Sequence, residues 1–424
     1  STGRSQQGRL YDTTLTDSAG LLASAIMGGL APSNQQWFEF FLGSWGGGPR
    51  VSRWAQQWDW ESQTWAQGAG RVLWRNLVDS NFSIDGFLAI LDVVIAGWAA
   101  LYIEEAEGGG IAFEAWPLWT VYMAQSRRGG PTDTFFRVYG LTAEQAVVAF
   151  GKDNLPENIR AKYETPQGRD ERFEFVHAIF PRAGAPEQGR FAQNMPFASV
   201  WVERTKRQVV RESGYHERPV ICPTWLPLTG SPYATSPTSD ALPDAKTLCK
   251  LVEFTLANAD LAVAGMWLGI DDGVLNPKSL KVGPRMIVAA AKSDSLTALQ
   301  PATKFDVAAL QADRLERKIR KIMFATQLEP TQGPTKTATE VQRDTYLVQQ
   351  ALGPRFGLFE ASLLSPMMDR VFGLAWRAGV FSEPPESLRG QPMSIRWLSP
   401  LARAQSMEDV HAMDRFEMRL FTQA

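Results

Sequence analysis

The longest apolar stretch of the chain covers residues 86–103 and carries a single charge near its centre, Asp92. A membrane-spanning helix needs about 20 apolar residues, and a central Asp costs about 2.5–3.5 kcal/mol on insertion scales. The stretch therefore predicts a buried core helix rather than a membrane span. Its inner face would carry four side chains at helical spacing: Phe87, Leu91, Val94 and Trp98.

Two amphipathic segments precede this stretch. Thr16 is placed to cap a helix that ends at the Gly28-Gly29 pair. A second helix is predicted for residues 51–79, where three tryptophans fall on one side. Such an aromatic stripe is more typical of a core or a subunit interface than of a ligand cage. The three residues are Trp54, Trp58 and Trp65.

From residue 102 to residue 215 the pattern changes to short apolar runs separated by Gly- and Pro-rich turns, which is typical of β-strands. One helix interrupts them. Thr142 and Gln145 form a capping box at its start, and Gly151 ends it. The strand-like runs include residues 135–139, 173–179 and 199–202.

A Pro-, Ser- and Thr-rich connector, 222–239, leads into a long amphipathic helix predicted for 240–267. A Gly- and Pro-punctuated insert follows at 269–301 and contains a strand-like run at 286–290. A second helix is predicted for 305–325. The order is helix, small insert, helix. One face of the first helix collects Leu248, Val252, Thr255, Ala259 and Ala262.

A polar loop is predicted for 326–336, where Leu328 is the only large apolar residue. The next helix starts with a capping box formed by Thr337 and Glu340 and runs to about residue 378. Kinks are expected at Gly353-Pro354 and at Pro366. An amphipathic helix begins near Pro400. Together these elements predict an α+β fold that is mainly α.

The composition is that of an ordinary folded protein. The 424 residues include 43 Lys and Arg against 45 Asp and Glu, a formal net charge of −2. Tight nucleic-acid binding depends on many phosphate-neutralising cations, so any DNA contact must be sparse or local. Hydrophobic residues make up 44% and charged residues 21%, which excludes a disordered or fibrous chain. The length allows about two to four domains.

Chemistry-bearing residues are scarce. Two cysteines, Cys222 and Cys249, and three histidines offer neither a metal centre nor a disulfide framework, so we expect no metal and no other cofactor. The sequence contains no phosphate-binding loop, dinucleotide motif or nucleophile elbow. The chain begins with Ser1 rather than Met, and we expect the natural protein to extend beyond both ends.

Two acidic pairs could in principle bind a divalent ion for nuclease chemistry: Asp271-Asp272 and Glu104-Glu105. Both lie beside glycine-rich turns, where solvated carboxylates are common. His177 lies within an apolar run and is predicted to be a core residue whose ring has a hydrogen-bonding partner. We therefore predict that the protein is not an enzyme.

A collinear series of short strings runs through the whole chain. The strings are LYDTT at 10–14, DSNFS at 79–83, PLWTVYMAQSRRGGPTDTFFRVYGLTAEQAVVAFG at 117–151, VHAIFPR at 176–182, RESGYHERP at 211–219, ALPDAKTL at 241–248, TATE at 337–340, LGP at 352–354 and SPLARAQ at 399–405. In this order and spacing they resemble the portal, or head-to-tail connector, protein of short-tailed bacteriophages of the T7-like type. The sequence departs from that pattern at Tyr233-Ala234-Thr235, where Tyr-Gly-Arg is usual.

The resemblance implies a ring of about twelve copies at one vertex of the viral capsid, through which double-stranded DNA enters during packaging and leaves during ejection. The DNA contact would be independent of sequence. The implied partners are the terminase large subunit, a tail adaptor protein, and the major capsid and scaffolding proteins. The implied location is the virion, with assembly in the host cytoplasm. No membrane is involved.

The resemblance also implies a division into parts. A wing would cover residues 1–239. The first stem helix would cover 240–268, the clip 269–304 and the second stem helix 305–325. A tunnel loop would follow at 326–336, then the kinked wing helix and its return at 337–399, and the start of the crown at 400–424.

Two groups of polar residues are candidates for the DNA channel. On the tunnel loop these are Gln332, Thr335 and Lys336, with Lys336 the preferred DNA-facing group. The second predicted stem helix has a basic stripe that either lines the channel or forms a solvated or inter-subunit ion-paired face. The stripe consists of Arg314, Arg317, Lys318 and Lys321, offset from Leu315, Ile319 and Ile322.

Two other functions stay open from the residues alone. A metal-dependent DNA-processing enzyme would need magnesium-dependent cleavage that disappears when Asp271 or Asp272 is replaced by Ala. A capsid structural protein without DNA passage would tolerate Lys336→Ala with no effect on packaging. A portal should instead assemble into rings with a central hole.

Overall fold

The computed structural model describes residues 10–42, 60–106, 108–182, 184, 191–264, 266–269, 296–299, 305–328, 355–388, 393–400 and 402. The chain divides into two compact units. The first unit consists of residues 1–18 and 240–326, and the second of 19–239 and 327–424. The larger part of the first unit is therefore an insertion into the second.

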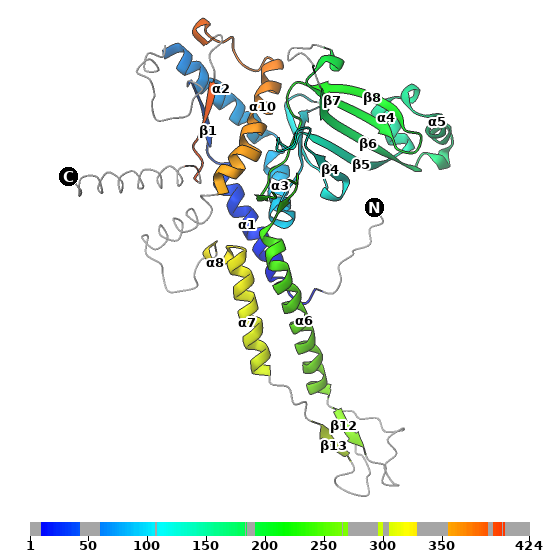
Figure 1. The fold of residues 1–424 in the computed structure, drawn as a ribbon, viewed down its shortest axis with the longest axis vertical. Coiled ribbons are helices and arrows are strands. Elements are labelled where there is room, and N and C mark those ends of the chain that lie inside the picture. Colours follow the sequence, from blue (N-terminus) through cyan, green and yellow to red (C-terminus); the bar gives the residue numbers. More distant parts are fainter. Residues whose placement is uncertain are drawn as a thin grey trace, which may run out of the picture. The chain divides into compact units, whose positions relative to one another are not determined.

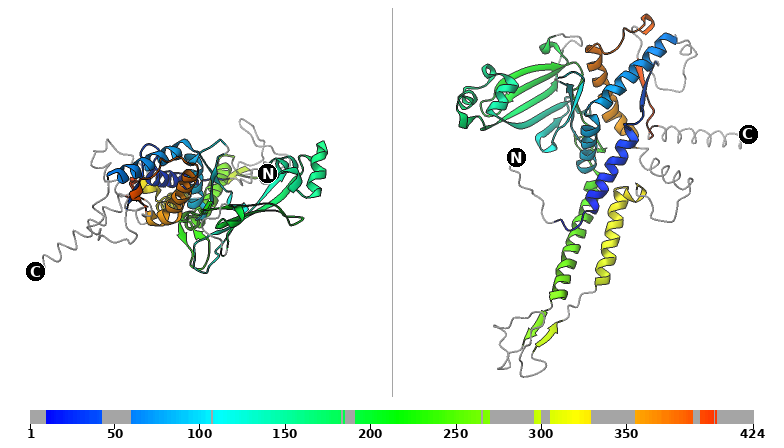
Figure 2. Two further views of the ribbon diagram at one scale, coloured as in Figure 1. Left: turned by 90° about the horizontal axis from the view of Figure 1, so that it is seen from above. Right: turned by 180° about the vertical axis from the view of Figure 1, so that it is seen from behind.

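The first unit is built on two long helices, α6 (Pro237–Ala264) and α7 (Phe305–Ile322), which lie side by side (Figures 1 and 2). The strand β12 (Met266–Gly269) follows α6 and pairs antiparallel with β13 (Leu296–Leu299), which precedes α7. This order confirms the predicted pattern of helix, insert and helix. The strand-like run at 286–290 lies outside the described residues.

The start of α6 lies three residues before the predicted start at Asp240. The Ser236 hydroxyl accepts a hydrogen bond from the Ser239 amide at 2.9 Å, which satisfies one of the free N–H groups of the first turn. Pro237 occupies the first helical position, where a missing N–H costs nothing. The helix ends at Ala264 instead of Trp267 because β12 begins at Met266.

The second unit contains a five-stranded antiparallel sheet in the order β4-β5-β6-β7-β8 (Figure 1). Thr142 and Gln145 form the predicted capping box, with both reciprocal hydrogen bonds present, and Gly151 follows the last turn of the helix that they start. The strands are β4 (Val121–Ala124), β5 (Thr134–Thr142), β6 (Arg172–Pro181), β7 (Phe197–Glu203) and β8 (Gln208–Tyr215).

One face of this sheet is covered. Towards one end, α4 (Ala143–Phe150) and α5 (Glu157–Glu164) pack on it around Phe175, which is fully buried. Towards the other end, Phe135 and Ile179 belong to a core that also includes residues of a second, three-stranded sheet. That sheet has the order β3-β2-β9 and consists of β2 (Leu101–Glu105), β3 (Ile111–Ala115) and β9 (Val220–Ile221).

The prediction that the apolar stretch 86–103 forms one helix is wrong. Helix α3 (Phe82–Ala96) starts earlier and stops at Gly97, which takes a left-handed φ of +91° and caps the helix, and β2 then begins at Leu101. Of the four residues predicted for the inner face, Val94 and Trp98 are buried, Trp98 beyond the helix, whereas Phe87 and Leu91 are only half-buried. No helix among the described residues is long and apolar enough to cross a bilayer.

The two N-terminal helices also differ in part from their prediction. Helix α1 (Thr14–Leu30) begins two residues before Thr16, with Asp12 accepting a hydrogen bond from the Thr14 amide at 3.0 Å, and it continues through the Gly28-Gly29 pair. Helix α2 (Trp60–Asp79) matches the predicted helix from residue 60 to its end, and residues 51–59 of the prediction lie outside the described residues. Strand β1 (Phe38–Leu42) pairs antiparallel with β14 (Met393–Trp397).

Where a kink was predicted at Pro366, the helix contains a π-helical turn just before the proline. A π-helical turn, η6 (Glu360–Leu364), leads directly into α10 (Ser365–Arg377), with the proline in the first turn. Proline removes one helical N–H and crowds the preceding turn, and a π-bulge is one way in which a helix accommodates this. The predicted kink at Gly353-Pro354 and the start of the helix at Thr337 lie outside the described residues, as does the predicted helix after Pro400 apart from residues 400 and 402.

Candidate nucleic-acid interface

The two long helices of the first unit are joined by an ion pair. Lys318 Nζ of α7 lies 2.8 Å from Asp244 Oδ2 of α6. The lysine side chain is 60% exposed and the aspartate 18% exposed, so the pair lies at the edge of the contact between the helices. One of the four residues predicted as a basic stripe therefore binds within its own subunit.

The inner faces of the same helices are apolar. On α6, Ala241, Ala245 and Leu248 are buried at i, i+4, i+7 spacing, and Val252 continues this row half-buried. On α7, Ile319 is fully buried. Thr255 and Ala259 continue the row, also half-buried, so it contains four of the five residues that the sequence placed together on α6; nothing is described of the side chain of the fifth, Ala262. Small side chains in the row let the two helices approach closely.

The other three predicted basic residues lie on the opposite side of α7. Arg314, Arg317 and Lys321 are all exposed, and at 100° per residue they lie about 140–160° around the helix from Ile319. Leu310, 62% exposed, is one turn further along the same face. We call these four residues the outer face of α7. Lys318 lies only about 40° around the helix from Arg314, and it differs from the three basic residues of this face in its ion pair with Asp244.

The exposed side of α6 has mixed charge. Lys250 Nζ lies 2.8 Å from Glu253 Oε2 and 4.7 Å from the ring centroid of Phe254. Lys246 is exposed one turn earlier. By sequence, α7 carries a net positive charge and α6 an equal net negative charge, so the positive charge of the helix pair is concentrated on α7.

The residues predicted for the tunnel loop, Gln332, Thr335 and Lys336, lie outside the described residues. The structure does describe the first part of the range 326–336. A short helix, α8 (Ala325–Leu328), follows α7, so the first three residues of the predicted loop are helical.

Side chains that could bind a metal ion do not gather in the described residues. No cluster of three or more His, Cys, Asp or Glu side chains suited to a metal ion occurs there. Glu104 and Glu105 are exposed at the end of β2, and Glu104 accepts a hydrogen bond from the Tyr102 hydroxyl. The pair Asp271-Asp272 lies outside the described residues.

His177 is a core residue, as predicted. Its Nε2 lies 2.8 Å from the Ser199 hydroxyl oxygen, and its ring stacks on Trp201 with centroids 4.1 Å apart. Burial lowers the pKa of His177 to about 3, and the positive charges of Arg137 and Arg211 act in the same direction. The imidazole is therefore neutral and structural at physiological pH.

One charged cluster of the second unit was not foreseen from the sequence. Glu217 lies between Arg370 and Arg377 of α10, with Oε2 3.0 Å from Arg370 Nη1 and 2.7 Å from Arg377 Nη2. Arg370 is buried and also donates to the Ile103 carbonyl oxygen. Burial alone would raise the pKa of Glu217, but the two arginines outweigh it and hold that pKa below its usual value.

The sequence offers no signal for this cluster, because Glu217 lies 153 residues from Arg370. The same holds for Asp244, which lies 74 residues from Lys318. The RESGYHERP string contains Glu217 but does not identify its partners.

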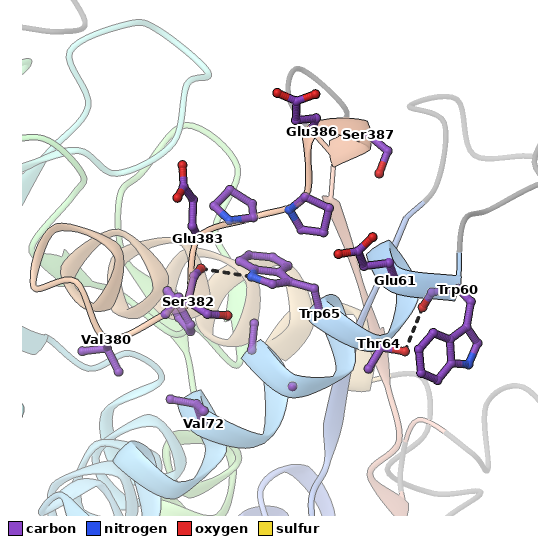
Figure 3. Close-up of a pocket in the computed structure, with 15 residues that line it drawn as sticks. Trp60, Glu61, Thr64, Trp65, Val72, Val380, Ser382, Glu383, Glu386 and Ser387 are labelled. Carbon is purple, nitrogen blue, oxygen red and sulfur yellow. Dashed lines mark hydrogen bonds between the residues drawn. The ribbon is translucent and has the colours of Figure 1, made fainter.

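A hollow of about 1030 Å³ lies between α2 and residues 380–387 (Figure 3). Trp65 Nε1 donates to the Ser382 carbonyl oxygen at 3.0 Å and joins the two sides. The lining of this hollow includes three carboxylates but no histidine, cysteine or lysine, so the hollow provides no imidazole or thiol for nucleophilic catalysis. Trp65 packs against Trp376 and Phe381, which supports the structural role predicted for it; Trp54 and Trp58 lie outside the described residues.

Comparison with known proteins identifies the family. The family described as "Bacteriophage head to tail connecting protein" matches residues 1–422. This chain therefore belongs to the bacteriophage head-to-tail connecting protein family, as the collinear strings indicated.

Two relatives are named as portal proteins. The "Probable portal protein" of Bordetella phage BPP-1 is 24% identical over 434 residues, covering 98% of this chain and 74% of the relative. The "Portal protein" of Salmonella phage epsilon15 is 26% identical over 330 residues, covering 73% of this chain and 57% of the relative. A solved structure titled "Virion of native gene transfer agent (GTA) particle" aligns over 98% of this chain and 92% of that chain, with 11% identity and a TM-score of 0.38.

Proposed function

We propose that this chain is the subunit of a phage portal, a ring at one capsid vertex through which double-stranded DNA is packaged and ejected. The observation that carries the proposal is the family match over residues 1–422. Both relatives described above bear the name portal protein, which supports it. In this role the protein is structural and catalyses no reaction.

The parts of the chain take the following roles in the proposal. The pair α6 and α7 forms the stem, the insert between them forms the clip, and residues 326–336 form a loop that points into the bore. The second unit forms the wing, and residues 400–424 begin the crown. The ion pair between Lys318 and Asp244 and the buried apolar row between the helices support a stem in which α6 and α7 pack together.

The proposed ring contains about twelve copies in a closed heterologous arrangement. Its partners are the terminase large subunit during packaging, a tail adaptor protein afterwards, and the major capsid and scaffolding proteins at the vertex. The DNA contact is independent of sequence. A net charge of −2 suits a conduit, since every neutralised phosphate adds a salt-dependent hold on the duplex.

The outer face of α7 is the described surface best suited to contact DNA. It presents three cations and one leucine and lies opposite the buried side of the helix. On the loop, Lys336 with Gln332 and Thr335 completes the proposed set of DNA-facing residues.

Packaging tests this role directly. A triple variant, Arg314→Ala, Arg317→Ala and Lys321→Ala, should still assemble but should package or retain less DNA, and the salt dependence of retention should weaken by about 0.9 log unit per log unit of salt for each phosphate that is no longer neutralised. Lys246→Ala with Lys250→Ala on α6 is the matched control. If the triple variant packages DNA normally, the outer face of α7 does not contact DNA in the channel. Magnesium-dependent DNA cleavage by the purified protein would favour an enzyme instead.

A further inference from the structure

Helix α3 has two apolar faces, of which the described residues of its own subunit cover one. Phe82 and Val93 belong to the buried face, which lies against the three-stranded sheet, with the Phe82 and Phe113 ring centroids 5.1 Å apart. The opposite side carries apolar residues at i, i+4, i+7 and i+11, which places them in one row. These are Ile84 (64% exposed), Leu88 (44% exposed), Leu91 (half-buried) and Ile95 (47% exposed). We call this row the α3 stripe.

A helix that is hydrophobic all round is normally buried on all sides. The α3 sequence contains no Lys or Arg, and the residues of the stripe are all Leu or Ile. Asp92 lies beside the stripe, and burial raises its pKa to about 6, so even the single acidic group in this part of α3 is poorly hydrated. The stripe therefore has the character of an interface.

The five-stranded sheet of the same unit also has an uncovered apolar face. Side chains alternate between the faces of a strand, and cross-strand partners share a face. Tyr122 pairs with Phe136, Phe136 with Ala178, and Ala178 with Val200, so these four side chains form one row across four strands. Tyr122 is 58% exposed and Phe136 37% exposed.

More apolar residues extend this row on the same face, among them Phe180 (36% exposed) and Val209 (52% exposed). Ion pairs surround the apolar centre: Glu174 with Arg204, and Glu212 with Arg182. An apolar centre with a polar rim is the usual anatomy of a protein interface. We call this whole face of the sheet the open sheet face. Its half-buried members are Val138, Val176, Val200 and Val202.

We propose that the α3 stripe of one copy packs on the open sheet face of a second copy. The inference rests on the proposed ring, in which each subunit offers one surface to the copy before it and a different surface to the copy after it. The two surfaces match in size. The stripe spans 11 residue steps, about 16 Å, and the four-strand row spans about 14 Å. Packing of a helix on a sheet is also the usual way to bury an apolar sheet face.

Charge favours a second copy as the occupant. Asp85 and Asp92 give α3 a negative charge. The turn between β7 and β8, at the end of the open sheet face, presents Lys206 and Arg207, both exposed. One contact of this kind covers both apolar surfaces on every subunit of a closed ring. A different protein bound to either surface would leave the other exposed.

Cross-linking between introduced cysteines tests the arrangement. Leu88→Cys and Phe136→Cys are combined in the assembled protein with Cys249→Ala. Cys222 can remain, because burial raises the pKa of its thiol to about 12 and leaves it unreactive at neutral pH. Treatment with a short bis-maleimide should convert the double-cysteine protein into a ladder of covalent multimers.

The single-cysteine proteins are the controls. Each alone should give no covalent multimer. A mixture of the two, dissociated and reassembled together, should give dimers only, because each chain carries one introduced cysteine and only some contacts bring a stripe cysteine against a sheet cysteine. Particle mass, measured before cross-linking, tests the ring separately from the stripe-to-sheet contact. If intact rings give no ladder, or only cross-links within single chains, the stripe-to-sheet contact is wrong and the ring is not affected. If no rings form, both proposals are wrong.

Assembly gives an independent readout. Leu88→Asp should shift the protein from rings to monomers while its circular dichroism stays unchanged, because the side chain is exposed in the subunit. The matched control is Val148→Asp on α4, which is 83% exposed and lies on neither surface; it should assemble normally. Rings formed equally well by both variants would contradict the proposal.

Discussion

Lys318 on α7 and Asp244 on α6 form an ion pair with 2.8 Å between Nζ and Oδ2. The two residues come from the helices on either side of the insert, and their contact joins these helices. It also removes Lys318 from the basic stripe, of which Arg314, Arg317 and Lys321 remain exposed on the outer face.

This pair should stabilise the helices only modestly. Exposed pairs contribute about 0.2–1 kcal/mol because water screens them and two side chains lose freedom. Lys318→Ala and Asp244→Ala should therefore each lower the urea midpoint of unfolding slightly, and the double variant should lose less than the sum of the two. Lys321→Ala, on the outer face, is the control and should leave the midpoint unchanged. A double-variant cycle without coupling would mean that the pair does not stabilise the protein.

Glu217 should be far more important to stability than any surface carboxylate of the second unit. Its loss leaves the buried Arg370 without its partner, and breaking a buried pair costs about 3–5 kcal/mol. Glu217→Gln should produce most of this loss in urea unfolding. Glu174→Gln, whose pair with Arg204 is exposed at both ends, is the control and should cost about 1 kcal/mol or less.

The same cluster predicts a pH dependence. Because the pKa of Glu217 is lower in the folded protein, its contribution is fully present above its ordinary pKa and is lost as the pH falls through the folded value. Stability measured from pH 6 downward should fall less steeply in Glu217→Gln than in the unchanged protein. Parallel curves would show that the carboxylate titrates alike in both states.

His177 should add a second acid-sensitive contribution at higher pH. The unfolded chain takes up a proton near the ordinary histidine pKa of 6.5, whereas the folded protein resists protonation until about pH 3. Stability should therefore fall between these limits by up to about 1.4 kcal/mol per pH unit. The combined variant His177→Phe and Ser199→Ala removes the titrating ring without stranding the Ser199 hydroxyl, and its stability should fall less steeply between pH 6.5 and pH 5 than that of the unchanged protein. A slope equal to that of the unchanged protein would contradict this account.

Gly97 should tolerate no side chain. Its φ is +91°, and an added Cβ would lie 2.6 Å from the carbonyl oxygens of Ala234 and Thr235. The positive φ alone costs about 1–3 kcal/mol in a residue with a side chain. Gly97→Ala should therefore lower the melting temperature clearly. Gly20→Ala on α1, where nothing lies within 4 Å of the added carbon, is the control and should raise it slightly.

Local signals in the sequence were sufficient where a short motif decides the structure. The capping box of Thr142 and Gln145 places the start of α4 correctly, because both hydrogen bonds lie within one turn. The boundary between α3 and β2 was missed because apolar side chains continue across it. Gly97 was the available local signal, because glycine commonly ends a helix in the left-handed conformation. The close approach of Ala234 and Thr235, which leaves no room for a side chain at this position, involves residues far away in the sequence.

The candidate site was predictable only in its composition. The spacing of Arg314, Arg317 and Lys321 places them on one helical face, and the structure exposes that face. The ion pair of Lys318 depends on Asp244, and no pattern within α7 reveals a partner on another helix.

The central claim is that this chain works as one segment of a hollow ring that passes duplex DNA, and an electron microscopy image of the purified protein along the symmetry axis tests it most directly. We predict a closed ring of about twelve subunits around a hole wide enough for a double helix. A compact, stable monomer at micromolar concentration, or a ring too narrow to admit the duplex, would contradict it.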